Sequence, residues 1–271
     1  FAMIRGAVLG SPISHSLSPV LHSAAYEFLQ IDGEYRAIDV QAGTLAAFFA
    51  DNREKFDYFS LTMPLKEEVL ALAIAMDSHT QLIQSANTLV KKKGVWSLSS
   101  TDGSGLVAAL DNAGVASIDS VLVLGAGATA RAVTGALDDR VSHLHVLGRS
   151  TVRQAALEAA VTHAEFAYLR WTLDIDFSQY DLVVNTTPAG AADLLEESVQ
   201  PGITATLFDV IYKPWPTELA QRWSDCGGTV INGLELLLYQ GIDQLEIVLG
   251  EPIDRLALAH HLRPLLLKAA R

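Results

Sequence analysis

One stretch decides the fold class of this chain: Val121-Leu122-Val123-Leu124-Gly125-Ala126-Gly127-Ala128-Thr129-Ala130. It opens with an apolar run typical of a buried strand, and residues 131–137 continue as a helical sequence. The turn between them reads G-x-G-x-x-A. In that pattern the first glycine permits a tight turn, the second lets the backbone approach a pyrophosphate, and the alanine lets helix and strand pack closely. The N–H groups at the helix start would bind the phosphates. The stretch therefore predicts a dinucleotide site, with a glycine-rich turn of an ordinary α/β fold as the alternative. Its predicted cofactor-binding residues are Gly125, Ala126, Gly127 and Ala128.

The predicted dinucleotide site lies in the middle of a 271-residue chain, which is long enough for two domains. Strand-like and helix-like segments alternate on both sides of it, so we expect an α/β fold with mostly parallel sheets. We predict an N-terminal α/β substrate-binding and catalytic domain over residues 1–103, completed by C-terminal helices within 233–271. A Rossmann-type dinucleotide-binding domain should cover residues 115–232, with the substrate in the cleft between the two.

Periodicity and turn residues give the expected elements. Strands are predicted at residues 4–10, 35–40, 56–61, 143–147, 182–185 and 206–209, and a hairpin pairs 87–90 with 95–98. Helices are predicted at residues 19–29, 66–76, 103–113 and 233–249, and a last one begins at Pro252. Pro264 should kink or end that last helix, because proline lacks an N–H donor.

Composition narrows the function. The formal net charge is −12 and the longest basic run is Lys91-Lys92-Lys93, so the sequence does not predict binding to nucleic acid. Cys226 is the only cysteine, which fits a reducing compartment. Phe1-Ala2-Met3 lacks the features of a signal peptide, and no apolar run is long enough for a membrane span. We therefore expect a cytoplasmic location. The eight histidines show no metal-ligand spacing, so no metal site is predicted.

The second strand of the Rossmann unit indicates which nicotinamide dinucleotide binds. An NAD enzyme usually carries an acidic residue roughly 20 residues after the first glycine, where it binds the ribose 2′-hydroxyl. This chain reads Leu147-Gly148-Arg149-Ser150-Thr151-Val152-Arg153 instead. Guanidinium groups and hydroxyls suit a 2′-phosphate, so Arg149, Ser150 and Arg153 predict NADP. The alternative is that both arginines are surface residues at the start of a helix.

Blocks in the first hundred residues resemble the shikimate dehydrogenase family. Gly10-Ser11-Pro12-Ile13-Ser14-His15-Ser16-Leu17-Ser18-Pro19 is similar to the family's opening motif, and later blocks agree in the same order. These are Leu61-Thr62-Met63-Pro64-Leu65-Lys66, Ala86-Asn87-Thr88-Leu89, Thr101-Asp102-Gly103, Asn185-Thr186-Thr187-Pro188, Asp209-Val210-Ile211-Tyr212-Lys213-Pro214 and residues 233–240. The sequence departs from the family's usual residues at Ser60, Ser100, Ala128 and Gly148-Arg149-Ser150.

The resemblance implies an NADP-dependent oxidoreductase that interconverts 3-dehydroshikimate and shikimate in the shikimate pathway of aromatic amino acid biosynthesis. It implies Lys66 and Asp102 as the catalytic pair, since the alkoxide left by hydride transfer needs a proton donor. Either could be the formal acid, and His15 is expected to be structural. Substrate contacts are expected from Ser16, Ser18, Thr62, Asn87, Tyr212 and Gln240, and further cofactor contacts from Asn185, Thr186, Thr187 and Gly233.

The start of the first long helix has a separate prediction. Ser18 should cap that helix and Pro19 should take its first position, so its N-terminus could bind the substrate carboxylate.

Two alternatives to shikimate dehydrogenase stay open. One is a quinate or dual quinate/shikimate dehydrogenase, because pocket shape decides between those substrates. The other is a non-catalytic nucleotide-sensing protein on the same scaffold, which need not keep both Lys66 and Asp102. In either case we expect a small-molecule ligand and a monomer or homodimer.

Overall fold

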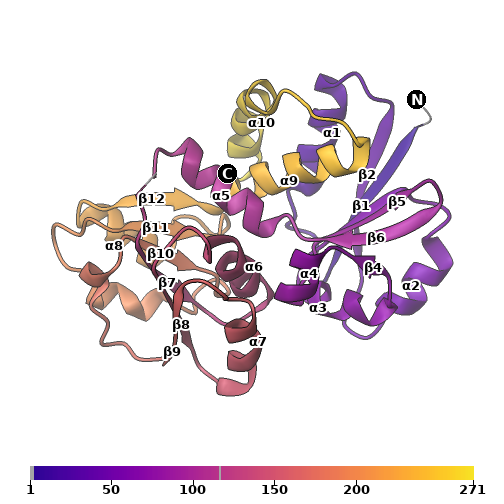
Figure 1. Cartoon of the computed structure of the whole chain (residues 1–271). Helices are drawn as coiled ribbons and strands as arrows, with labels where there is room; N and C mark the ends of the chain where they lie inside the picture. The colour runs from indigo at the N-terminus through magenta and orange to yellow at the C-terminus, as the bar shows by residue number, and fades with distance from the viewer. Residues whose placement is uncertain (1–2, 116) are drawn as a thin grey trace. The chain divides into compact units, whose positions relative to one another are not determined.

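The protein folds as two compact units in the computed structural model, which describes residues 3–115 and 117–271. The first unit comprises Phe1–Gly105 with Leu237–Arg271, and the second comprises Leu106–Leu236 (Figure 1). The chain passes from one unit to the other within two helices, α5 (Asp102–Asn112) and α9 (Gly233–Leu249). No helix among the described residues is long and apolar enough to cross a membrane. The expectations for residues 1 and 2 lie outside the described residues.

The first unit is built on a six-stranded sheet in the order β2-β1-β3-β5-β6-β4. Its strands are β1 (Ile4–Gly10), β2 (Gly33–Asp39), β3 (Tyr58–Leu61), β4 (Ala75–Met76), β5 (Thr88–Lys92) and β6 (Val95–Ser99). Strands β1, β2 and β3 run parallel, whereas β5 pairs antiparallel with both β3 and β6. The predicted hairpin is confirmed, and its turn uses positive φ at Lys93 and Gly94.

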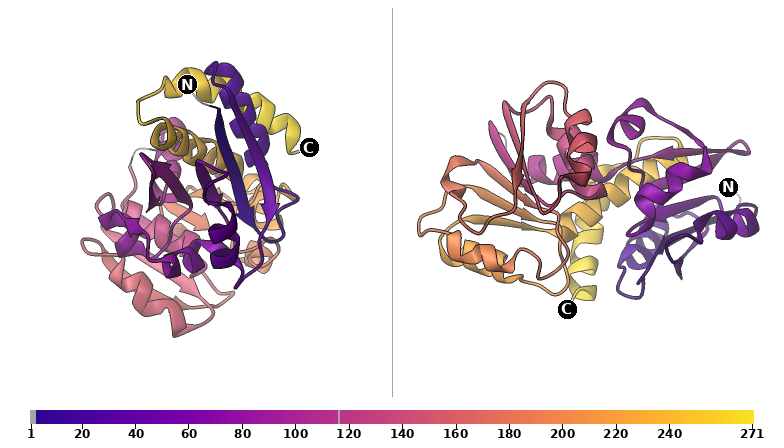
Figure 2. Two further views of the ribbon diagram at one scale, coloured as in Figure 1. Left: turned by 90° about the vertical axis from the view of Figure 1, so that its right-hand side faces the viewer. Right: turned by 90° about the horizontal axis from the view of Figure 1, so that it is seen from below.

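Helices cover the sheet of the first unit. Its own helices are α1 (Ser18–Phe28), α2 (Leu45–Asn52), α3 (Leu65–Glu68), α4 (Ser78–Ile83) and α10 (Arg255–Ala269), and the 3₁₀ segment η1 covers Val69–Leu72. Helix α1 contacts β1 and β2 and also packs along α10, as Figures 1 and 2 show. One core cluster joins Leu9, Phe59, Leu65 and Leu98, all at most 2% exposed. This burial fixes the strands on which the candidate site is built.

The second unit is a six-stranded parallel sheet in the order β12-β11-β10-β7-β8-β9. Its strands are β7 (Ser120–Leu124), β8 (His143–Gly148), β9 (Glu165–Arg170), β10 (Leu182–Asn185), β11 (Thr206–Asp209) and β12 (Thr229–Asn232). Its helices are α6 (Ala128–Leu137), α7 (Gln154–Ala159) and α8 (Glu218–Asp225), with 3₁₀ segments η2 (Thr151–Arg153), η3 (Phe177–Gln179) and η4 (Asp193–Ser198). This strand order is that of a Rossmann fold, which confirms the expected fold class.

Burial on both faces explains the apolar run that begins the predicted dinucleotide site. Leu122 and Leu124 belong to a core cluster with Trp223 of α8, while Val121 and Val123 are equally buried. Alternate residues of a strand point to opposite faces, so β7 is covered on both sides, as a central parallel strand must be.

Two sequence-based element predictions need correction, and one of the two effects expected of Pro264 does not occur. The helix expected over 66–76 ends as a 3₁₀ turn at Leu72, because Ala73 adopts a left-handed conformation and residues 75–76 pair with β6. The last helix begins at Arg255 rather than Pro252, since the Asp254 side chain caps it by accepting from the N–H of Ala257. Pro264 does not end that helix, which continues to Ala269. Strands β9 and β12 were not predicted.

Candidate active site

The predicted catalytic and substrate residues of the first unit follow from its strand directions. Strands β1, β3 and β6 point the same way, so their carboxyl ends lie at one edge of the sheet, where antiparallel β5 begins. Backbone bonds tie the segments at this edge together: Ser11 N–H donates to Met63 O at 3.0 Å, and Leu61 N–H donates to Asn87 O at 2.7 Å. This arrangement gathers segments far apart in the sequence.

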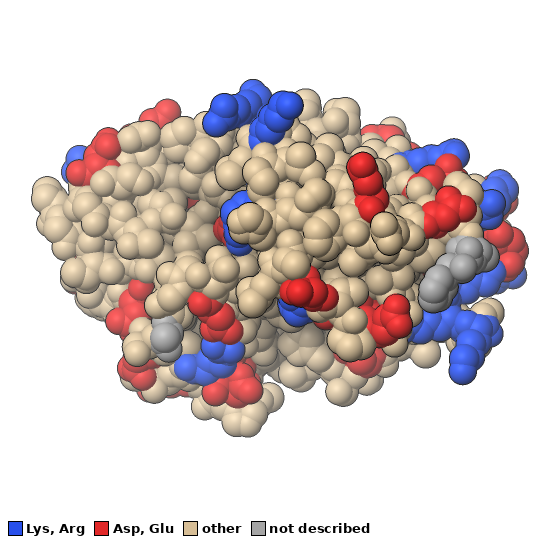
Figure 3. Space-filling model, turned by 90° about the horizontal axis from the view of Figure 1, so that it is seen from above, with Lys and Arg blue, Asp and Glu red and all other residues tan. Residues whose placement is uncertain are grey.

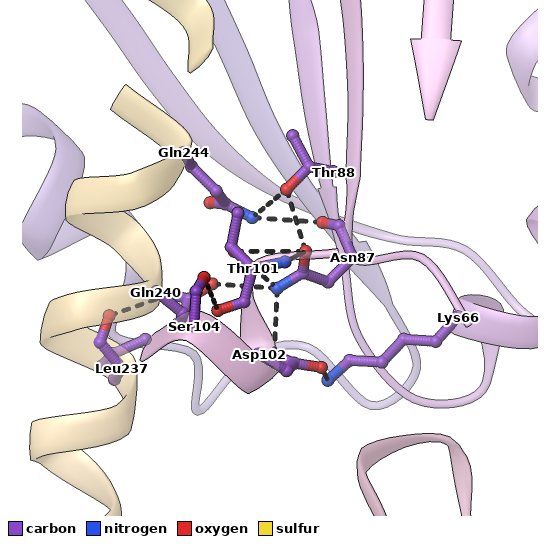
Figure 4. Close-up of polar contacts among 9 residues, drawn as sticks. All are labelled: Lys66, Asn87, Thr88, Thr101, Asp102, Ser104, Leu237, Gln240 and Gln244. Atoms are coloured by element: carbon purple, nitrogen blue, oxygen red, sulfur yellow. Dashed lines mark hydrogen bonds and ion pairs between the residues drawn. The ribbon is translucent and has the colours of Figure 1, made fainter. Parts of the chain in front are cut away.

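Lys66 and Asp102 meet at this edge. Lys66 lies in α3, directly after the loop that follows β3, and Asp102 is the first residue of α5. Lys66 Nζ lies 2.5 Å from Asp102 Oδ2, with side-chain exposures of 14% and 6% (Figure 4). Asp102 lies at the N-terminus of α5, where the helix dipole favours a carboxylate, and the contact with Lys66 is a largely buried ion pair.

Asn87 connects this pair to its surroundings (Figure 4). Its Nδ2 donates to Asp102 Oδ1 and Thr101 Oγ1, each at 2.9 Å, and lies 3.2 Å from Gln240 Oε1. Its Oδ1 accepts from Thr101 N–H at 2.8 Å and from Thr88 Oγ1 at 2.9 Å. The amide has only two hydrogens for three acceptors, so one of these contacts can give way to a ligand oxygen.

Gln240 and Gln244 bring α9 to the same edge. Gln244 Nε2 donates to Asn87 O at 3.1 Å and to Thr88 Oγ1 at 2.9 Å, while its Oε1 accepts from Ser60 Oγ at 2.8 Å. The sequence motifs do not indicate Gln244, although its position one turn after Gln240 is the spacing that places two side chains on one helix face. Thr88 and Thr101 lie within the family blocks, which imply no role for either residue.

The serine-rich loop after β1 differs from its prediction. Helix α1 begins at Ser18 with Leu17 before it, and no side chain makes a cap hydrogen bond. Instead Ser16 Oγ accepts from Ser18 N–H at 3.3 Å. The expected capping role of Ser18 is therefore wrong, because Ser18 already lies inside the first turn. Ser16 is partly exposed and Ser18 is buried.

Thr62 lies at this edge of the sheet, whereas His15 lies on an exposed part of the loop after β1. Thr62 lies between β3 and α3, and its N–H donates to Leu9 O at 2.9 Å. A side chain on Gly10 would overlap the Thr62 methyl group, so glycine lets the two loops approach.

The turn after β7 has the geometry that phosphates require. Gly125 adopts φ +102°, a conformation that favours glycine, and Gly127 is extended and precedes α6 without a side-chain cap. A Cβ atom on Gly125 would also approach Thr186 Oγ1 to 2.8 Å. The positive end of the α6 dipole therefore lies at this glycine turn, and the residues present fit a dinucleotide pyrophosphate.

The Asn185-Thr186-Thr187 loop braces this turn from the neighbouring strand. Thr186 Oγ1 donates to Leu124 O at 2.8 Å, and Asn185 Oδ1 accepts from Thr187 Oγ1 at 2.7 Å. Asn185 Nδ2 donates to Asp209 Oδ1 at 3.1 Å, so the buried Asn185 amide is engaged at both ends. Strands β7 and β10 are adjacent where the strand order reverses, which is the place where such folds bind ligands.

The two arginines after β8 differ in position. Arg149 and Ser150 are exposed, and Ser150 Oγ accepts from Val152 N–H at 3.3 Å. Arg153 reaches back to the phosphate turn, because a Cβ on Gly127 would lie 3.5 Å from its Nη1. This places cationic donors beside the anion site.

Tyr212 and Gly233 also belong to the second unit. Tyr212 lies on the loop after β11, and Gly233 N–H donates to Ile211 O at 3.2 Å in that loop. A side chain on Gly233 would overlap Val210 O, so glycine is required where α9 starts. Their expected ligand contacts remain predictions.

Comparison with known proteins decides the family. Residues 8–89 match the model of the shikimate dehydrogenase substrate binding domain. The shikimate dehydrogenase (NADP(+)) of Methanococcoides burtonii is 33% identical over 90% of this chain and 92% of its own length. The chain belongs to the shikimate dehydrogenase family. The sequence motifs predicted the same family, and that prediction is confirmed.

Solved structures of the shikimate dehydrogenase family agree with the fold. The Mycobacterium tuberculosis shikimate dehydrogenase superposes with a TM-score of 0.85 at 34% identity, covering 97% of this chain and 99% of that one. A shikimate 5-dehydrogenase from Thermus thermophilus, solved with NADP(H) and shikimate, gives 0.81 at 30% identity, covering 97% and 100%. Membership therefore extends over both units.

Proposed function

We propose that this chain is an NADP-dependent shikimate dehydrogenase that interconverts 3-dehydroshikimate and shikimate in the shikimate pathway of aromatic amino acid biosynthesis. Relatives that cover nine-tenths of the chain carry the name shikimate dehydrogenase (NADP(+)). The observation that carries the proposal is the contact between Lys66 Nζ and Asp102 Oδ2 at 2.5 Å, because a non-catalytic sensor needs no such pair.

Lys66 and Asp102 handle the proton in this proposal. Bound NADPH supplies the hydride. The oxygen of the reduced carbonyl then needs a proton, and Lys66 Nζ is the donor nearest to the orienting carboxylate of Asp102. Asp102 holds the ammonium in place, while Asn87 Nδ2 holds Asp102 through its other oxygen. In the reverse direction the same pair accepts the proton.

The remaining predicted side chains bind and orient the substrate in this proposal. Ser16 and Ser18 bind the carboxylate through their hydroxyl groups, and Tyr212 remains a further predicted carboxylate contact. Thr62, Asn87 and Gln240 bind ring hydroxyls. Asn87 and Gln240 lie within one hydrogen-bonded group, so a ring hydroxyl that displaces their mutual contact would be recognised by both.

NADP binding is assigned to the second unit. The turn of Gly125, Ala126, Gly127 and Ala128 would hold the pyrophosphate, and Arg149, Ser150 and Arg153 would hold the 2′-phosphate. Thr186 and Thr187 border that turn, Asn185 supports them through its shared bonds, and Gly233 at the start of α9 remains a predicted cofactor contact.

The proposal also covers partners and location. We expect small-molecule ligands only, a monomer or homodimer, and a cytoplasmic protein. The net charge of −12 opposes binding to nucleic acid, and the two signs of charge are interspersed on the face drawn in Figure 3. Cys226, the single cysteine, is buried.

One assay tests the proposed function. Purified protein is given NADP or NAD, each with shikimate or quinate, and formation of reduced nucleotide is followed. We expect the fastest reduction with NADP and shikimate. Faster turnover of quinate would move the protein to the quinate dehydrogenases, and absence of turnover with all four pairs would contradict an enzymatic role.

A further inference from the structure

Tyr168 occupies a space that Gly148 leaves open at the end of β8. Tyr168 lies in β9, which pairs with β8, and its ring extends toward Gly148. A Cβ atom on Gly148 would overlap the Tyr168 hydroxyl and come within 2.6 Å of Cζ. The phenol and a side chain at position 148 therefore exclude each other.

The Tyr168 hydroxyl is bonded to the loop that carries the two arginines. It donates to Ser150 O at 2.5 Å, across 18 residues of sequence. Burial raises the pKa of the Tyr168 phenol, so the hydroxyl is protonated and can donate at neutral pH. Ser150 in turn begins the 3₁₀ segment η2, since its Oγ accepts from Val152 N–H. One tyrosine thus fixes the backbone from which both Arg149 and Arg153 project.

The loop itself buries little apolar surface. Arg149, Ser150 and Val152 are all exposed, and Val152 is 88% exposed. Gly148 O accepts from Trp171 N–H at 3.0 Å, which anchors the loop's first residue to the end of β9. A segment with so little buried apolar surface depends on individual hydrogen bonds for its conformation.

We propose that Tyr168 is a positioning residue for recognition of the 2′-phosphate, acting by holding the Ser150 carbonyl and hence the Arg149–Arg153 loop. This inference rests on the proposed NADP dependence. Tyr168 does not touch the reacting atoms and need not touch the cofactor. It sets the placement of cationic donors that discriminate a phosphorylated ribose from an unphosphorylated one, because charged hydrogen bonds depend strongly on geometry.

The test measures direct binding of two nucleotides by calorimetry, without turnover. The probes are 2′,5′-ADP and 5′-ADP, which are compared for their binding to the same site with and without the 2′-phosphate. Tyr168→Phe keeps the ring in place over Gly148 and removes the hydrogen bond. We expect 2′,5′-ADP to bind roughly threefold to tenfold more weakly, the scale of one net hydrogen bond, while 5′-ADP binding stays unchanged.

Two further variants complete the test. Tyr180→Phe is the matched control, because the Tyr180 hydroxyl contacts His145 Nδ1 at 2.9 Å, away from this loop, and neither affinity should change. Gly148→Ala should displace the phenol and lower the 2′,5′-ADP affinity as Tyr168→Phe does. The double variant should be little worse than the worse single one, since both changes break the same contact.

The outcomes separate this inference from the proposed function. If the unmutated protein binds 2′,5′-ADP no better than 5′-ADP, the NADP assignment and this inference fail together. If the unmutated protein prefers 2′,5′-ADP and Tyr168→Phe keeps that preference in full, only the role of Tyr168 is overturned. Equal weakening of both probes also overturns it, because that pattern indicates general damage to the nucleotide site.

Discussion

Lys66 and Asp102 are separated by 36 residues in sequence and joined by the contact that the proposed chemistry needs. We predict that Lys66→Ala lowers turnover of shikimate by at least about a hundredfold, the lower scale for a lost general acid or base. Affinity for NADP should survive, since the predicted cofactor residues belong to the other unit. Steady-state rates and a separate binding measurement check this.

Lys91→Ala is the matched control for Lys66→Ala. Lys91 Nζ pairs with Glu54 at 2.6 Å on the surface, and its loss should leave turnover unchanged.

Asp102→Asn should act like Lys66→Ala because it removes the charge that orients the lysine. The double variant of Lys66 and Asp102 should be little worse than the worse single variant. Near-normal turnover of Lys66→Ala would move the proton donor elsewhere, with His15 the next candidate.

Arg149 is predicted to determine the preference for NADP over NAD. Losing a charged hydrogen bond costs about 1.5–3 kcal/mol, so Arg149→Ala should weaken NADP binding by roughly tenfold to a hundredfold and hardly affect NAD. Dissociation constants for both nucleotides decide this. Equal use of NADP and NAD by the unmutated protein would contradict the prediction that Arg149 binds the 2′-phosphate.

At the scale of the element, the start of α1 illustrates how a capping pattern can mislead by two residues. Ser-Pro predicts a cap at Ser18, but the bond is made by Ser16 Oγ to Ser18 N–H. We expect Ser16→Ala, rather than Ser18→Ala, to lower stability by about 1 kcal/mol, the scale of one net hydrogen bond, because Ser18 N–H loses its acceptor. Both variants should raise the Michaelis constant for shikimate. Unchanged kinetics in both would place the substrate carboxylate elsewhere.

Gln244 of helix α9 supports the edge of the sheet at which Lys66 and Asp102 meet. Gln244→Met keeps the volume but removes donors to Asn87 O and Thr88 Oγ1, and leaves Ser60 Oγ without its acceptor. We predict a stability loss of about 1–3 kcal/mol together with lower turnover, since Asn87 holds Asp102. Gln221→Met is the control, because the Gln221 side chain bonds Asp225 on the exposed side of α8. Reduced stability with unchanged turnover would make Gln244 purely structural.

The errors in the predicted elements have physical causes. Strand β9 has no fully buried residue and β12 has one, Ile231, so neither has the apolar run that identified β7. The helix over 66–76 failed because Ala73 turns left-handed to let residues 75–76 pair with β6, a tertiary contact that local periodicity cannot reveal. Pro264 was tolerated inside α10, where packing against α1 outweighs one lost hydrogen bond.

At the scale of the whole molecule, motif order predicted more than local structure did. The glycine turn identified a Rossmann fold because its chemistry is confined to one strand, one turn and one helix. The residues of the candidate active site could be predicted only from the family motifs, because they come from separate segments of the sequence. These residues are Lys66, Asn87, Asp102 and Gln240. Gln244 and Tyr168 act through partners 157 and 18 residues away, and no spacing rule links those pairs.

The first unit also contains a buried group that should make its stability depend on pH. His22 is fully buried, stacks on Tyr35 with ring centroids 4.1 Å apart, and contacts the Tyr58 hydroxyl through Nδ1 at 2.8 Å. Burial lowers the pKa of His22 from 6.5 to about 3. The tyrosines around it, Tyr26, Tyr35 and Tyr58, have pKa values raised by burial and stay neutral, so they offer no charge to stabilise an imidazolium.

Between about pH 6.5 and 3, His22 therefore binds a proton in the unfolded chain but not in the folded protein. A lowered folded-state pKa gives stability that is present above pH 6.5 and is lost as pH falls toward 3. The full slope is about 1.4 kcal/mol per pH unit for one proton. Between pH 6.5 and 5 the raised pKa values of the buried Asp209 and Asp243 act in the opposite direction, and comparison with a His22 variant removes their contribution. We predict that the contribution of His22 to stability against urea falls steadily as pH is lowered across this range.

His22→Asn isolates the contribution of this histidine. Asparagine can keep a polar contact to Tyr58 but does not titrate, so the variant should be less stable at pH 7 and lose less stability on acidification. The partly exposed His145 also has a pKa lowered by burial and contributes equally to both proteins, so it cancels in the comparison. Parallel stability curves for the two proteins between about pH 7 and 5 would show that His22 is protonated equally in the folded and unfolded chains.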